Sequence, residues 1–381
     1  MIRISVCSLV LTTILLFDAH AVTFNHIVTL GDSLLDDTGG DRSPVAAEHV
    51  AKRLGVPLTK FAESGSTSTA LIDQGQHTQA AVQFGAGDLA MLWIGGNDFF
   101  SNPFEITFGG TDFLDTLESN VDTVMSTLNN TGMEIVAFNL PDMSQVPGVI
   151  DAVEAATILT PFLRRPAFEN ITDATIQWNA RLNSVASTYG ATVVDVFTIF
   201  NNLFVDPDSY SLLDHAPILN ANTGCQYCVF FDDILLPDVH PSSFAQGFIA
   251  NDAIVAINEV YDFQGAMPLE LLSIVELALL ADLYAGDFDE NNIVDASDLG
   301  RWETNFGLSG SATHFQGDAN GDLHVNGSDI LIWQQQHAGN FATQSVSVPE
   351  PGSLTLALLA CYGLRVKRLA IRSPAVFAAS V

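Results

Sequence analysis

The chain has 381 residues, enough for two or three domains, and 48% of them are hydrophobic, so a substantial buried core is expected. Its formal net charge is −31 at pH 7. A protein this acidic repels phosphate backbones, which argues against a nucleic-acid partner and favours divalent cations. Four cysteines in such a long chain are too few for a disulfide-stapled scaffold.

The first residues are typical of a secretory signal. Met1–Phe17 contains one basic residue, Arg3, followed by an apolar run, and Ala19-His20-Ala21 fits the small-x-small cleavage pattern. We therefore expect residues 1–21 to be removed and the mature protein to begin near Val22.

The stretch His26–Gly40 joins an apolar run to a turn that carries a hydroxyl group. Ile27 to Leu30 reads as a short buried strand, and Gly31-Asp32-Ser33 follows as a sharp turn. The carboxyl ends of strands are the edge at which open α/β sheets carry out chemistry. Gly-Asp-Ser is also ordinary turn composition, so this stretch alone does not define a nucleophile.

Strand-like apolar runs then alternate with helical patterns as far as residue 264. This alternation predicts a parallel sheet covered by helices on both faces, that is, an α/β fold. The predicted helices are residues 46–54, 113–128 and 174–188, and the predicted strands are residues 89–94, 134–139 and 191–197.

Three further segments carry groups that suit acyl transfer. Gly65 lies in a small polar turn, and Asn97 follows two glycines at the end of an apolar run. The backbone N–H groups of Ser33 and Gly65, with the Asn97 amide, would give three donors for an oxyanion. An Asn after two glycines is otherwise a plain turn former. His240 lies in Leu235–Ser243, and histidine is the side chain best able to accept a serine proton near neutral pH.

These blocks resemble, in the same order, those of the GDSL family, or SGNH hydrolases. The resemblance runs from Phe24 to about Val260 and rests on Gly31-Asp32-Ser33-Leu34, Gly65, Gly95-x-Asn97-Asp98 and His240-Pro241. It implies a flavodoxin-like, three-layer α/β/α hydrolase that cleaves carboxylic esters through an acyl-enzyme. It also implies that Ser33 is the nucleophile, that His240 is the general base, and that Ser33, Gly65 and Asn97 supply the oxyanion donors.

The sequence departs from the family pattern at the acid. The family usually places its acid three residues before the histidine, but Pro237 occupies that position here. We expect Asp238, two residues before His240, to orient the imidazole, with Asp233 or Asp232 as alternatives. In the same loop, Cys225 and Cys228 have no second cysteine pair or paired histidines nearby, so a small disulfide is expected rather than zinc.

Residues 265–285 read as a helical linker, and residues 286–341 contain an internal repeat with a period of 31 residues. Each copy places oxygen side chains at loop positions 1, 3, 5, 9 and 12, which is what Ca²⁺ needs, and continues into a helix with a tryptophan at the same offset. The predicted Ca²⁺ ligands are Asp287, Asp289, Asn291, Asp295 and Asp298 in the first loop and Asp318, Asn320, Asp322, Asn326 and Asp329 in the second.

The repeat resembles a type I dockerin, which implies a small all-α calcium-binding domain that docks onto a cohesin partner. Position 6 of each loop, where glycine normally accepts a positive φ, holds Asn292 in the first loop and Leu323 in the second. Asparagine tolerates that conformation, whereas leucine there costs about 1–2 kcal/mol. We therefore expect the second loop to be reshaped or to bind Ca²⁺ more weakly.

The last segment, residues 342–381, resembles the PEP-CTERM sorting signal of bacterial envelopes. Val348-Pro349-Glu350-Pro351 precedes the apolar stretch Gly352–Leu364 and the basic run Arg365–Arg368. The resemblance implies recognition and removal of the tail by a sorting protease after export, with membrane anchoring until then.

The sequence as a whole predicts an exported serine esterase or lipase whose substrate is an ester of a lipid or an acetylated glycan. The expected location is the bacterial envelope or the extracellular space. The alternative is a surface-displayed binding or structural protein in which the hydrolase fold has little activity.

Overall fold

The computed structural model describes residues 20–21, 23–36, 44–217, 240–262, 268–281 and 283–341. Most of the expected signal segment, the cysteine pair Cys225 and Cys228, and the tail from residue 342 lie outside the described residues. The same holds for Asp238 and its alternatives Asp232 and Asp233. These expectations therefore stay predictions.

A five-stranded parallel sheet forms the centre of the molecule, with the strand order β3-β2-β4-β5-β6. Its two central strands, β2 and β4, are almost continuously buried, as expected for a parallel sheet covered on both faces. In the register of this pair Gly31 lies opposite Trp93, so the two strands end together. The strands are β2 (His26–Gly31), β3 (Leu58–Lys60), β4 (Asp88–Trp93), β5 (Glu134–Phe138) and β6 (Thr192–Val194).

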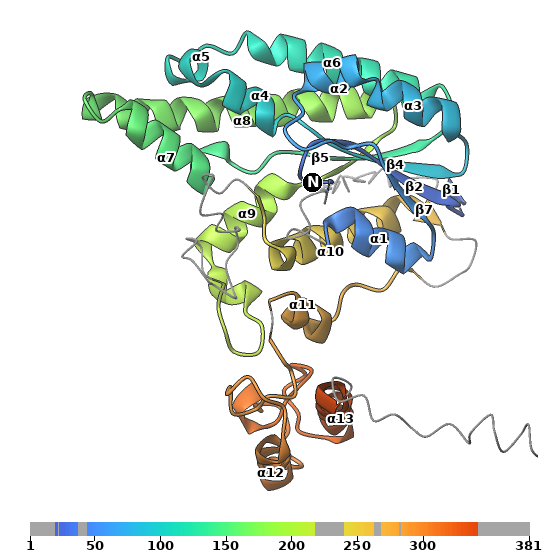
Figure 1. Cartoon of the computed structure of the whole chain (residues 1–381), viewed down its shortest axis with the longest axis vertical. Helices are drawn as coiled ribbons and strands as arrows, with labels where there is room; N and C mark the ends of the chain where they lie inside the picture. Colours follow the sequence, from blue (N-terminus) through green and yellow to red (C-terminus); the bar gives the residue numbers. More distant parts are fainter. Residues whose placement is uncertain are drawn as a thin grey trace, which may run out of the picture.

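Helices cover both faces of this sheet (Figure 1). One layer contains α2 (Ser68–Gln74), α3 (Gln76–Gln83), α6 (Phe113–Asn129) and α8 (Arg164–Thr188), and the other contains α1 (Ala46–Leu54) and α10 (Ser243–Val260). The prediction of a parallel α/β sheet between two helical layers is confirmed. The remaining elements of this body are β1 (His20–Ala21), α4 (Gly96–Ser101), α5 (Pro103–Thr107), α7 (Pro147–Ala156), α9 (Val196–Val205), β7 (Tyr261–Asp262) and the 3-10 helices at Met143–Gln145, Pro161–Leu163 and Pro207–Tyr210.

Two helices differ in length from the sequence prediction. Helix α8 begins at Arg164, ten residues before the predicted start, because its first turns also bury apolar side chains, Ala167 and Ile171. Among the described residues of the predicted linker, 268–281 and 283–285, only Ile274–Leu280 form a helix, α11. Residues 268–273 before it form neither helix nor strand, and the side chains of Asn258 and Asn251 bond the backbone of Leu269 and Leu272.

The internal repeat folds as two loop-helix units that pair reciprocally. The helices are α12 (Ala296–Asn305) and α13 (Gly327–Phe341), with a 3-10 turn at His314–Gln316 between them. The indole N–H of Trp302 in α12 donates to the Asn326 carbonyl of the second loop, at 2.9 Å. That of Trp333 in α13 donates to the Asp295 carbonyl of the first loop, also at 2.9 Å. The matching tryptophans therefore bind each unit to the loop of the other.

Within the part of the chain that the structure describes, none of the helices combines the length and the apolar character needed to cross a membrane.

Candidate active site

The turn after β2 is built so that Ser33 stands at the carboxyl edge of the sheet. Gly31 has φ 127°, and a Cβ atom there would lie 1.8 Å from the Trp93 carbonyl oxygen, so the close approach of β2 and β4 requires glycine. The buried side chain of Gln76 holds the same residue from the other side. It accepts the Gly31 N–H at 2.9 Å and donates to the Gly31 carbonyl at 3.1 Å. Both the N–H and the carbonyl group of Gly31 are thus fixed, and with them the turn that carries Ser33.

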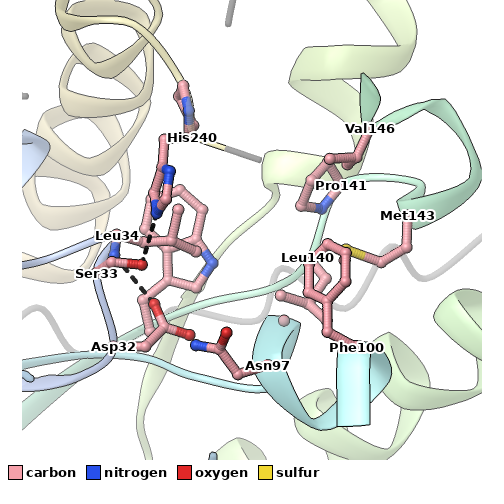
Figure 2. A pocket seen from close by; sticks show the side chains of 13 residues that line it. Asp32, Ser33, Leu34, Asn97, Phe100, Leu140, Pro141, Met143, Val146 and His240 are labelled. Atoms are coloured by element: carbon pink, nitrogen blue, oxygen red, sulfur yellow. Dashed lines mark hydrogen bonds between the residues drawn. The ribbon is translucent and has the colours of Figure 1, made fainter. Parts of the chain in front are cut away.

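Ser33 and His240 come together across this edge. The Ser33 hydroxyl and the Nε2 atom of His240 are 2.8 Å apart, a hydrogen bond between residues 207 positions apart in the chain (Figure 2). His240 precedes helix α10, which begins after Ser242, whose hydroxyl accepts the Ala245 N–H at 3.2 Å. A serine hydroxyl within hydrogen-bond distance of an imidazole is the arrangement that activates a serine nucleophile.

The three predicted oxyanion donors are placed differently. Asn97, on α4, lines the same pocket as Ser33 and His240. Its amide group donates one bond to the Ser66 carbonyl at 3.0 Å, which fixes the orientation of the side chain. Gly65 lies in a turn and has φ 80°. A hydrogen bond from the Ser66 N–H to the Glu63 carbonyl closes this turn. Gly65 is not among the residues that line the pocket. Ser33 and Asn97 therefore line one pocket, and the role of all three residues as oxyanion donors stays a prediction.

Two buried carboxyl groups, those of Asp32 and Asp98, directly neighbour Ser33 and Asn97 in the sequence. Asp32 accepts the Leu34 N–H at 3.0 Å, and its side chain lies beside that of Asn97 (Figure 2). Burial raises the pKa of Asp32 to about 7, with a smaller upward contribution from the charge of Asp98. Burial also raises the pKa of Asp98, although Ser68 stabilises its charged form by donating from its hydroxyl at 2.6 Å and from its N–H.

The raised pKa of Asp32 predicts how stability depends on pH. The Asp32 carboxyl loses its proton near pH 4 in the unfolded chain and near pH 7 in the folded protein. Between these pH values the folded state therefore carries the proton and the unfolded state does not. The free energy of unfolding should therefore fall from pH 4 to pH 7 by an amount on the order of 4 kcal/mol from this residue. Asp32→Asn keeps an oxygen acceptor for Leu34 and removes the titration.

Denaturant unfolding at pH 4.5 and pH 7.5 measures this effect. The stability of Asp32→Asn relative to the wild type should be higher at pH 7.5 than at pH 4.5. An equal difference at the two pH values would contradict the assignment.

The wall of the pocket opposite Ser33 and His240 is apolar. Side chains from α4 and from the segment after β5 form it (Figure 2). Asn179 of α8 fixes this segment, because its side chain accepts the Leu140 N–H at 3.0 Å and donates to the Leu140 carbonyl at 2.8 Å. No pattern in the sequence indicates this apolar wall. Its residues are Phe100, Leu140, Pro141, Met143 and Val146.

The first loop of the repeat gathers acidic side chains into a small volume. Asp287, Asp289 and Asp298 each offer a carboxylate oxygen, and these oxygens lie within 4.8 Å of one another. Asp287 accepts the N–H groups of Asn291 and Asn292, and Asp298 accepts those of Asp289 and Asp295.

The second loop follows the same path as the first. Asp318 accepts the N–H groups of Gly321, Asp322 and Leu323, and Asp329 accepts that of Asn326. Position 6 has φ 64° in Asn292 and φ 66° in Leu323. The second loop is therefore not reshaped relative to the first, and this part of the expectation is wrong. Leu323 adopts the strained left-handed conformation instead.

Residues 29–245 match the model of the GDSL-like Lipase/Acylhydrolase family, which is more than half of the chain. The protein belongs to this family. No curated protein matches the chain.

Several solved structures are similar to the chain. One is a catalytic mutant of an acetylxylan esterase from Geobacillus stearothermophilus, with 15% sequence identity, a TM-score of 0.40, and coverage of 64% of this chain and 97% of that chain. Another is a lipolytic protein of the G-D-S-L family from Veillonella parvula, with 15% identity, a TM-score of 0.39, and coverage of 60% and 96%.

Proposed function

We propose that the protein is a serine hydrolase that cleaves carboxylic esters, with Ser33 as nucleophile and His240 as general base. One observation carries this proposal. The Ser33 hydroxyl lies 2.8 Å from Nε2 of His240, in a pocket at the carboxyl edge of the sheet. Membership of a family of lipases and acylhydrolases supports the same reaction.

The residues of the pocket suit the two halves of the reaction. As the Ser33 oxygen bonds to the ester carbonyl carbon, its proton passes to His240 Nε2, and the carbonyl oxygen gains a negative charge near the Asn97 amide and the Ser33 N–H. The bond to the leaving alkoxide then breaks, and that alkoxide takes the proton from His240. In the second half, His240 takes a proton from water, the hydroxide adds to the acyl carbon, and the proton returns to the Ser33 oxygen as the acid leaves.

Turnover of p-nitrophenyl acetate by the chain from residue 22 onward tests this function. The proposal predicts release of p-nitrophenolate well above the rate in buffer. The alternative, a surface-displayed binding or structural protein with little activity, predicts no enzyme-dependent release.

We further propose that the two loops of the repeat bind Ca²⁺ and that this module tethers the hydrolase to a cohesin-like partner. The clustered carboxylates of the first loop and the matching bonds of the second support ion binding, because like charges this close repel one another until a cation neutralises them. Export by the signal segment, and removal of the tail by a sorting protease at the bacterial envelope, belong to the same proposal.

Calcium should bind the first loop more tightly than the second and should raise the stability of the module. Leu323 must hold φ 66°, whereas Asn292 tolerates φ 64°. Calorimetric titration of the whole protein with CaCl₂ should therefore show two unequal sites, with Asp298→Ala lowering the affinity of the tighter site and Asp329→Ala that of the weaker one. Absence of calcium heat, or a tighter second site, would show the loop assignment to be wrong.

A further inference from the structure

A second pocket lies beside the catalytic pocket and is almost entirely apolar. It is enclosed by α4, α5, α7, α8 and the 3-10 turn at Met143–Gln145. Its residues are Phe99, Phe100, Pro103, Ile106, Thr107, Met143, Val149, Ala152, Val153, Ala156 and Ile171. The single hydroxyl among them, that of Thr107, already donates to the Pro103 carbonyl at 2.7 Å.

Two side chains belong to both pockets. Phe100 of α4 and Met143 line the catalytic pocket and also the apolar one, so they form the boundary between the two. In Figure 2 both lie across the catalytic pocket from Ser33 and His240. A methionine side chain is unbranched and adapts its shape readily, so this boundary can yield to a chain that extends away from Ser33.

The chemistry of the second pocket selects its occupant. A sugar ring carries several hydroxyl groups, and each would lose its bonds to water in a pocket that has no charged side chain and one already bonded hydroxyl. A hydrocarbon chain has no such groups, and its binding becomes more favourable with each methylene that leaves water. An acetyl group is too small to reach past Phe100 and Met143, so an acetylated glycan would leave the second pocket unused.

We propose that the apolar pocket between α5 and α7 binds the acyl chain of the ester, which makes the substrate of this enzyme a lipid-type ester with a medium or long chain. This inference rests on the proposed function, because the ester carbonyl must sit at Ser33 for its chain to enter the pocket past Phe100 and Met143. It selects between the two substrate classes, lipid and acetylated glycan, that the sequence leaves open.

The outer surfaces of the same two helices fit this assignment. Phe104 and Phe108, at α5, are 78% and 61% exposed, and their rings contact each other at 4.9 Å between centroids. Ile158 and Leu159, in the turn that follows α7, are 70% and 90% exposed. Exposed large apolar side chains mark sites of contact with proteins, membranes or apolar ligands, and a lipid substrate is one such contact.

Substitution on α7 gives a matched pair of variants. Ala156 lines the apolar pocket and Ala155 does not, yet both are exposed alanines on one helix. Ala156→Phe should fill the pocket, and Ala155→Phe should add the same bulk outside it. The readout is kcat/KM of the whole protein for p-nitrophenyl esters from acetate to decanoate.

For the wild type, kcat/KM should rise up to about fourfold for each methylene that enters the pocket. The ratio of the decanoate to the acetate value should fall at least about tenfold in Ala156→Phe and stay at the wild-type level in Ala155→Phe. An equal effect of the two variants, or a preference for acetate in the wild type, would overturn the acyl-chain assignment and leave the proposed function standing.

Binding of 1-octanol, followed by calorimetry, tests the pocket without turnover. The wild type and Ala155→Phe should bind it, and Ala156→Phe should bind it at least about tenfold more weakly. If no ester is hydrolysed but octanol binds in this pattern, the proposed function fails and the apolar pocket stands. If octanol does not bind the wild type, or binds the two variants equally, the acyl-chain assignment is wrong.

Discussion

Ser33→Ala is expected to abolish ester hydrolysis while leaving the fold intact. The hydroxyl that bonds His240 Nε2 at 2.8 Å is the only group this substitution removes, and without it no acyl-enzyme can form. Removal of the nucleophile from a serine hydrolase lowers kcat by about a millionfold. Release of p-nitrophenolate from the acetate ester gives the rate, and thermal unfolding shows whether the variant is folded.

The surroundings of Ser33 explain why the fold should survive. The turn is held by the bonds between Gln76 and the backbone of Gly31, neither of which involves the serine side chain. The melting temperature should therefore stay close to that of the wild type. Turnover retained in purified Ser33→Ala would contradict the mechanism. If the variant lost both its turnover and its fold, the lost activity would be a consequence of unfolding.

The second large effect is expected from the acid that orients His240. Asp238→Asn should lower kcat by about ten thousandfold, because asparagine would favour the wrong tautomer of the imidazole and could not stabilise the imidazolium. Asp233→Asn is the control, and its kcat should stay near the wild-type value. The kcat of each variant for p-nitrophenyl acetate decides the assignment, and the reverse ranking would make Asp233 the acid.

The sequence predicts the serine and the histidine that the structure brings together, because each lies in a short local pattern. Gly31-Asp32-Ser33 follows a buried run, and His240 precedes a proline and a helix cap. Chemistry at the end of a strand depends on few residues, so such patterns can be read without knowing the packing. The parallel sheet is equally readable, since β2 and β4 are short, largely apolar runs that are buried on both faces.

The sequence does not reveal the contacts that arise only when distant segments pack together. Gln76 gives no signal as a polar residue early in a helix, yet it is buried and holds both polar groups of Gly31. The apolar pocket combines side chains from α4, α5, α7 and α8, and no single segment indicates a cavity. The early start of α8 at Arg164 has the same origin, because Ile171 packs into that pocket.

The most direct test of the central claim is to identify the residue that forms a covalent bond with an ester analogue. A p-nitrophenyl alkylphosphonate should phosphonylate the protein once, with loss of p-nitrophenolate, and mass spectrometry of the tryptic peptide that ends at Arg42 should place the adduct on Ser33. His240→Ala should slow this labelling at least about a hundredfold, because the hydroxyl would lose its general base. An adduct on another residue, or labelling that His240→Ala leaves equally fast, would contradict the account of Ser33 and His240 as the catalytic pair.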